Sequence, residues 1–309
     1  MRVLIHLTGD DALSSMESCS IAAGICALRA SVFPTESGVL RAIRELEEER
    51  SPFLLVTGLD QRELARAIQL EGKYCKTSVL LCDKPLVPSL KQTLAEEGFA
   101  RHLVPLGARL SRDLVPTLHR LAHPEFWPLS RSLATPAREH SISILVPRDL
   151  AFFKEVFERE FAMIGELSQK FMREGMFPRG WQAASELFDN ALRATLGEAK
   201  SEDFVLASHG AIDMSFACDG ETLGVSVTDK RGTLEPWTFF RSVFSRPSEA
   251  ALPGKTSLGM GLRATLASSA SVIASVSPGS STCVQAFLPL ERSQRAVAMR
   301  PKRVEYFTP

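Results

Sequence analysis

Short apolar runs alternate with amphipathic segments over residues 1–122. Between the runs, apolar residues recur at helical spacing, as in Gly38–Arg50. Strands and helices in alternation are typical of a parallel sheet covered on both faces. We therefore expect an α/β domain here, with buried strands at Arg2–Leu7, Ser51–Leu59, Thr77–Asp83 and Arg101–Gly107.

The composition changes at residues 123–140. Pro124, Pro128 and Pro136 are scattered there among serine and threonine residues. Proline at this density interrupts helices and sheet ladders. The segment predicts a linker between two domains.

Beyond the linker the order of elements is different. A strand at Ser141–Pro147 precedes two helical segments, Arg148–Glu174 and Trp181–Leu196, with a turn predicted at Phe177–Gly180. Apolar residues alternate with polar ones on both sides of Asp219-Gly220, which predicts a hairpin over residues 211–229.

The remaining pattern completes a second domain over residues 141–290. A helix is predicted at Gly259–Ala270, followed by a hairpin of Ser271–Ser277 with Thr282–Leu290. We expect an α+β domain with helices on one face of a mixed, mainly antiparallel sheet. Residues 291–309 show no pattern and predict a polar tail.

Composition and charge narrow the range of partners. Lys and Arg total 36, as do Asp and Glu, so the net charge is zero and neither nucleic acid nor an anionic membrane is an expected partner. No run approaches the roughly 18 apolar residues that span a bilayer, and the N-terminus turns acidic too early for a signal peptide. The six cysteines form no CxxC pair. We expect a cytoplasmic protein with reduced cysteines.

Glu186 and Asn190 lie four residues apart on a predicted helix, in "ASELFDNALRAT". Residues at this spacing lie one above the other, here beside an apolar stripe that includes Leu187 and Ala191. One interpretation is a surface pair. The other is a pocket wall, where an amide oxygen and a carboxylate hold a divalent cation and orient a hydroxyl group or water.

Two other stretches carry candidate chemistry. In "VTDKRG", Asp229 ends a predicted strand and could accept a hydrogen bond from an exocyclic amine, while Gly232 lets the backbone pass close to a flat ring. The same spacing is common in turns. In "SLGMGL", Gly259 and Gly261 lie where a loop enters a helix, a favourable place for phosphate.

The order and spacing of these motifs are more specific than any one of them. Ser141–Leu290 resembles the Bergerat-fold (GHKL) ATPases, the superfamily of gyrase, Hsp90, histidine kinases and MutL. "ASELFDNALRAT" resembles its N box, "VTDKRG" a shortened G1 box and "SLGMGL" its G2 box. The order of strand, long helix and N-box helix is most similar to the bacterial anti-sigma-factor serine kinases.

The resemblance implies an ATP site with Mg²⁺. It makes Asn190 the Mg²⁺ ligand and Glu186 the general base for attack on the γ-phosphate. Asp229 would accept from the adenine amine with support from Thr282, and Gly232 would let the ring pack closely. In the G2 box, Gly259 and Gly261 would cradle the phosphates, and Leu262 would also contact the nucleotide.

The resemblance also implies a lid over the nucleotide, at Thr233–Leu258. From this lid Lys255 would reach the terminal phosphates. The G1 box lacks the second glycine of the fuller motif, and the lid has few glycines. These departures leave two alternatives open: a protein serine kinase, and a nucleotide-binding interaction module with weak catalysis.

The first domain resembles a response-regulator receiver in the order of its elements. It has Thr57 near the place of the phosphoacceptor aspartate, so we expect a pseudo-receiver that docks or dimerises. Another flavodoxin-like domain is the alternative. The implied partner is a regulatory protein, such as a STAS-type antagonist or a sigma factor, and a homodimer is compatible with the sequence. A histidine-kinase core is disfavoured because it would need an acceptor histidine helix.

Overall fold

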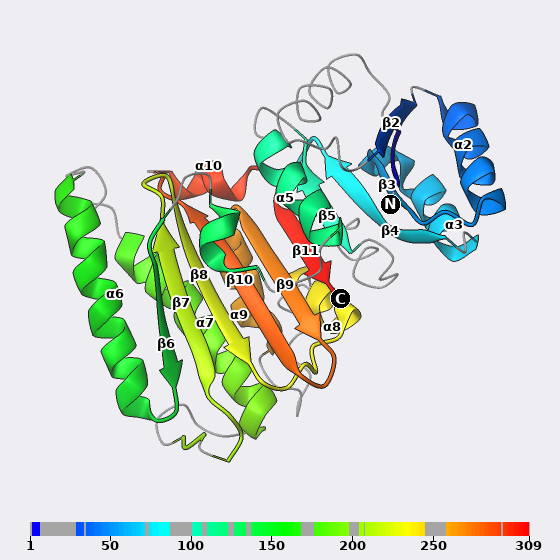
Figure 1. The fold of residues 1–309 in the computed structure, drawn as a ribbon. Helices are drawn as coiled ribbons and strands as arrows, with labels where there is room; N and C mark the ends of the chain where they lie inside the picture. The colour runs from blue at the N-terminus through cyan, green and yellow to red at the C-terminus, as the bar shows by residue number, and fades with distance from the viewer. Residues whose placement is uncertain are drawn as a thin grey trace. The chain divides into compact units, whose positions relative to one another are not determined.

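The structure is a computed structural model of the 309-residue chain (Figure 1). Its contacts divide the chain into two units. The first comprises Met1–Pro124 with Pro301–Glu305, and the second Glu125–Arg300 with Tyr306–Pro309. The structure describes residues 2–6, 29–33, 35–71, 74–86, 101–106, 110–122, 127–133, 137–167, 176–197, 204–206, 208–244, 258–291 and 293–308.

The first unit contains a parallel sheet. Its strands lie in the order β2-β1-β3-β4-β5, and a C-terminal strand, β11, pairs antiparallel with β5. All four predicted strands are confirmed, and β2 was missed. The bounds are β1 Arg2–His6, β2 Arg29–Phe33, β3 Phe53–Gly58, β4 Cys75–Cys82, β5 His102–Pro105 and β11 Arg303–Phe307.

Successive residues of β1 and β3 are buried. Since neighbouring residues of a strand point to opposite faces, both faces of this sheet are covered. Alternate residues such as Val3, Ile5 and Val56 form one apolar cluster with Leu114 and Leu118 of α5. The hydroxyl of Thr35 accepts a hydrogen bond from the Gly38 amide and caps α2. The helices are α2 Glu36–Glu48, η2 Leu59–Gln61, α3 Arg62–Glu71 and α5 Leu110–Ala122.

The second unit contains an antiparallel sheet in the order β6-β7-β8-β10-β9. Both predicted hairpins are confirmed, as β7–β8 and β9–β10. With the parallel strands of the first unit, the chain is a mixed α/β fold. The bounds are β6 Glu139–Ile144, β7 Ile212–Cys218, β8 Thr222–Asp229, β9 Ser271–Ser277 and β10 Ser281–Pro289.

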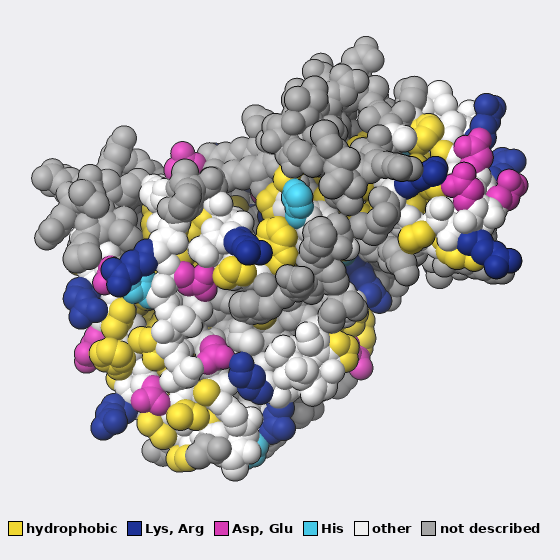
Figure 2. Space-filling model, in the orientation of Figure 1, with side chains coloured by type: hydrophobic (Ala, Val, Ile, Leu, Met, Phe, Trp, Pro, Cys, Tyr) yellow, Lys and Arg dark blue, Asp and Glu magenta, His cyan; other side chains and the backbone are white. Residues whose placement is uncertain are grey.

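Long helices pack on one face of this sheet (Figure 1). Leu223, Val225 and Val227 of β8 are buried on that face, and α7 packs against them. On the other face, Ser143 and Lys230 both bond to Asp213, and Figure 2 shows charges of both signs interspersed over the described surface. The helices are α6 Pro147–Leu167, α7 Met176–Leu196, α8 Pro236–Phe244 and α9 Leu258–Ser268.

The predicted turn at Phe177–Gly180 is wrong, because these residues form the start of α7. Pro178 lies in the first turn of the helix, where its missing N–H is not needed. Gly180 is buried, and a Cβ there would come within 2.6 Å of Leu223 Cδ2. The Pro and Gly that predicted a turn therefore serve a helix start and a close helix–sheet contact.

The predicted linker at 123–140 is partly ordered structure. A 3₁₀ turn, η3 (Leu129–Ser132), lies on the face of the sheet opposite α7, and β6 begins at Glu139. Leu129 is fully buried. It packs against Gly224, where an added Cβ would come within 2.9 Å of Leu129 Cδ1. Gln285 Nε2 also donates to the carbonyl of Trp127. Pro128 directly precedes η3, and the described residues 127–133 pack on the sheet.

The predicted polar tail at 291–309 is also wrong. The segment contains helix α10 (Gln294–Ala298) and the buried strand β11. Arg303 and Glu305 are 4% and 0% exposed and bond to each other at 2.6 Å. Charged residues buried as a pair give no hydrophobic pattern, so the sequence did not predict this strand.

No helix in the ranges that the structure covers is long and apolar enough to cross a membrane.

Leu129 provides a test that η3 belongs to the folded second unit. Replacing this fully buried side chain with alanine (Leu129→Ala) leaves a cavity, so we expect a loss of about 2–4 kcal/mol in the free energy of unfolding. Leu145→Ala, at a side chain that is 41% exposed, is the control and should change little. Urea denaturation measures both variants. Equal, small effects would show that residues 127–133 form a linker after all.

Candidate functional site

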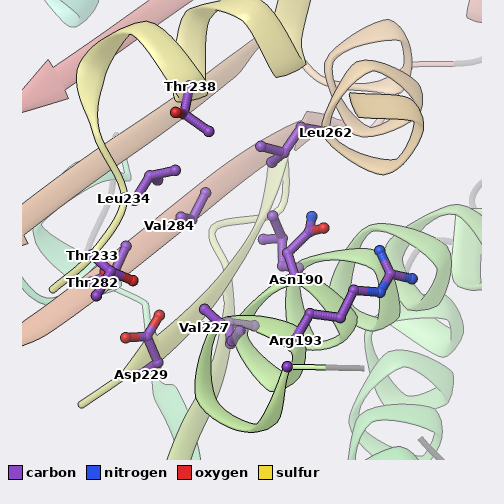
Figure 3. A pocket seen from close by; sticks show the side chains of 14 residues that line it. Asn190, Arg193, Val227, Asp229, Thr233, Leu234, Thr238, Leu262, Thr282 and Val284 are labelled. Atoms are coloured by element: carbon purple, nitrogen blue, oxygen red, sulfur yellow. The ribbon is translucent and has the colours of Figure 1, made fainter. Parts of the chain in front are cut away.

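A pocket of about 350 Å³ lies on the helical face of the second unit (Figure 3). Helix α7 forms one wall with residues spaced three and four apart, so that a single face of the helix is turned to the cavity. Strands β8 and β10 form the floor, and α9 and the segment after β8 close the other sides. The lining residues are Leu187, Asn190, Ala191, Arg193, Ala194, Gly197, Val227, Asp229, Thr233, Leu234, Thr238, Leu262, Thr282 and Val284.

Four of the predicted site residues therefore meet in one cavity. Asn190, Asp229, Leu262 and Thr282 come from four separate elements, and all of them line the pocket. Figure 3 shows Asp229 and Thr282 at one end and Asn190 with Arg193 along the helix wall. The predicted motifs are brought together by the fold.

Asp229 is the buried acid of the pocket, with 4% of its surface exposed. It is the last residue of β8 and lies directly opposite Thr282 of β10 in the antiparallel register. Its Oδ1 accepts the Arg231 amide at 2.8 Å. Burial raises the pKa of this carboxyl, and hydrogen bonds from the Arg231 and Gly232 amides and from Thr282 partly oppose that rise. Asp229 is thus a fixed acceptor in a mostly apolar cavity.

Two other polar groups of the pocket lack well-aligned partners among the described residues. Oγ1 of Thr282 is buried close to Asp229, yet it makes no hydrogen bond of good geometry. Nδ2 of Asn190 is also buried without a partner. Buried polar atoms are rarely left unpaired, because each lost bond costs about 1–3 kcal/mol. Both atoms indicate that the cavity takes a polar ligand or ordered water.

Glu186 does not line the pocket, but it lies beside the start of α9. A Cβ on Gly261 would fall 2.2 Å from Glu186 Oε2, so the glycine is what lets the helix backbone approach this carboxylate. Burial raises the pKa of Glu186, Asp189 adds to the rise, and Arg193 opposes it. A carboxylate with a raised pKa is a better proton acceptor than an ordinary surface glutamate.

Gly232 lies beside the β9–β10 turn, and not against the pocket where it was expected to let a ring pack closely. It does not line the pocket, and its φ of +62° is one that only glycine adopts easily. A Cβ there would be 2.1 Å from the Ser277 carbonyl oxygen. The glycine therefore lets the backbone pass close to the β9–β10 turn.

Two further predicted site residues are Gly259 of the G2 box and Lys255 of the lid. Gly259 lies in the first turn of α9. Lys255 lies outside the described residues.

The predicted lid, Thr233–Leu258, begins with a helix that the sequence did not indicate. In α8, Phe239, Phe240, Val243 and Phe244 are buried, and α8 packs on α9. The first half of the lid is therefore part of the folded core. Residues 245–257 are outside the described part of the chain.

Sequence reasoning missed Arg193, which lines the same cavity. Arg193 lies three residues after Asn190, so helical spacing alone could have placed it beside the predicted amide. Leu234 and Thr238 also line the cavity. Both fall within the predicted lid, but the sequence assigned no role to either, because the segment lacks a clear periodicity.

No protein-family model matches the chain, and no curated protein sequence matches it. The described residues also contain no cluster of three or more His, Cys, Asp or Glu side chains placed to hold a metal ion. The chemistry of this site is therefore judged from its own geometry.

The crowding around Gly232 gives a test of the site's framework. Gly232→Ala combines a strained φ with a clash against the Ser277 carbonyl, so we expect a loss of at least about 3 kcal/mol in the free energy of unfolding. Gly220→Ala has a similar φ, +85°, but open space around it, and should lose only about 1–2 kcal/mol. Guanidinium denaturation separates the two. Equal losses would mean that packing on the turn is unimportant.

Proposed function

We propose that the second unit is an ATP-binding domain of the Bergerat type that uses Mg²⁺ and acts in signalling as a protein serine kinase. The observation that carries the proposal is the meeting of Asn190, Asp229, Leu262 and Thr282 in one pocket. The sequence motifs by themselves predict these four residues as parts of a nucleotide site. An antiparallel sheet with helices on one face agrees with the proposed fold.

The end of the pocket at Asp229 suits an adenine ring. A buried carboxylate accepts hydrogen bonds, which matches the exocyclic amine of adenine and not the carbonyl oxygen that guanine has at the same position. The Thr282 hydroxyl beside it can bond the ring directly or through water. Val227, Leu262 and Val284 supply apolar surface for the faces of the ring. The volume is near the lower end of the range for small-molecule sites.

The opposite end suits phosphate. Arg193 is a cation that lines the pocket, and Asn190 lies one helical turn from Glu186 along α7. The Asn190 side-chain oxygen would hold Mg²⁺, a cation that prefers oxygen ligands and shares them with phosphate. When bound, Mg²⁺ would neutralise charge on the phosphate oxygens. Asn190 is the single protein ligand that we assign to it.

Glu186 would serve as the general base. A serine hydroxyl oxygen of the partner attacks the γ-phosphorus, its proton passes to the Glu186 carboxylate, and the bond to the β,γ-bridging oxygen breaks to release ADP. The raised pKa of Glu186 favours this proton transfer. Gly261 supports it by keeping the base free of a side chain from α9.

The first unit would act as a pseudo-receiver. Its strand order, β2-β1-β3-β4-β5, is the flavodoxin-like order of the doubly wound folds. Thr57 is fully buried near the carboxyl end of β3, where a receiver needs an exposed aspartate. Such a unit would bind a partner protein without forming an acyl phosphate. A STAS-type antagonist or a sigma factor is the partner class that the proposal carries, and a homodimer is consistent with it.

A second candidate is a nucleotide-binding interaction module with little catalysis. The observation that favours it is helix α8, which fixes the first half of the lid in the core. A lid that moves less would slow nucleotide exchange and turnover. Nucleotide would then stabilise one partner-binding conformation.

Calorimetric titration with ADP and ATP, each with Mg²⁺, tests the pocket. We expect the wild-type protein to bind both, and Asn190→Ala and Asp229→Asn each to bind at least about tenfold more weakly, because each loses a ligand contact. Asp229→Asn should also reduce the preference for ATP over GTP. Gln182→Ala removes an exposed carboxamide from the same helix and is the control. Wild-type protein that binds no nucleotide would refute the proposal.

Transfer of the labelled γ-phosphate of ATP, to a serine of a partner protein or to water, separates the two candidates. If Glu186 is the base, Glu186→Gln should lower turnover by about 10²–10⁴-fold and leave nucleotide affinity nearly unchanged. The wild-type rate should fall as the pH is lowered through the raised pKa of Glu186, because only the ionised carboxylate accepts a proton. Glu158→Gln, on the exposed side of α6, is the control. Turnover that is negligible in the wild type supports the binding module.

A further inference from the structure

The end of the C-terminal strand touches the wall of the pocket. Tyr306 is 2% exposed, and its hydroxyl donates to the carbonyl oxygen of Leu234. Its ring lies 5.9 Å, centroid to centroid, from that of Phe239 in α8. Leu234 lines the pocket, and so does Thr238, the neighbour of Phe239. Tyr306 thus supports two lining residues without lining the pocket itself.

The segment that Tyr306 contacts, residues 231–235, is held by other hydrogen bonds near its beginning. Residues 231–235 have no regular secondary structure. Arg231 bonds to the Thr195 carbonyl at 3.0 Å, and the Gly232 carbonyl accepts the Gly279 amide at 3.2 Å. These bonds hold the beginning of the segment. The Tyr306 hydroxyl bonds to the Leu234 carbonyl, where the segment reaches the cavity.

We propose that Tyr306 is a positioning residue for the nucleotide pocket. The physical reason is that its hydroxyl bonds to Leu234, which lines the pocket, while its ring packs near Phe239, the neighbour of the lining residue Thr238. The assignment of nucleotide as the ligand rests on the proposed function, whereas the support of Leu234 does not.

The support is tested by hydrogen–deuterium exchange of the full-length protein without nucleotide. Tyr306→Phe keeps the ring and removes the hydroxyl, so amides in residues 231–244 should exchange about 3–10-fold faster, the effect of losing one hydrogen bond. Tyr74→Phe is the matched control, because Tyr74 is the chain's other tyrosine and lies in the first unit. Exchange in Tyr306→Phe equal to that of the wild type would overturn the proposal.

ADP affinity completes the test. Tyr306→Phe should weaken ADP binding by about 3–10-fold, while Tyr74→Phe should bind like the wild type. Unchanged affinity in Tyr306→Phe would overturn its positioning role. Wild-type protein that binds no ADP would refute the proposed function, and the exchange rates, measured without nucleotide, would still decide whether Tyr306 holds the pocket wall.

Discussion

The antiparallel pairing of β8 with β10 is the constraint on which the site depends. The register places Asp229 opposite Thr282, and residues of a strand alternate between faces. Asp229, Val227, Thr282 and Val284 therefore all face the helices and form the pocket floor. A shift of one residue in either strand would turn its polar group to the opposite face of the sheet.

Helix α7 serves both the core and the site. Leu187 and Ala191 are buried and also line the cavity, and Asn190 and Arg193 share the border of the same face. Its partner α9 approaches closely because Gly261 has no side chain in front of Glu186. The candidate base and the candidate metal ligand are thus held by packing between helices, which orients them more firmly than a loop would.

The second unit also gives its lid a fixed beginning. The segment after β8 is attached at Gly232 to the β9–β10 turn, at Leu234 to Tyr306, and through α8 to the core. These attachments shape one side of the pocket. They also explain why a strand at the C-terminal end of the chain bears on a site built from residues 187–284.

Periodicity determined most of the elements. Apolar alternation gave the strands and hairpins, and the spacing of Glu186, Asn190, Asp229 and Gly261 gave the candidate chemistry, because these patterns are local. Tertiary structure decided the rest. Gly180 became helical through its contact with Leu223, Leu129 became core through packing against Gly224, and β11 formed because Arg303 and Glu305 neutralise each other inside the fold. Such partners are distant in sequence, so only the folded chain brings them together.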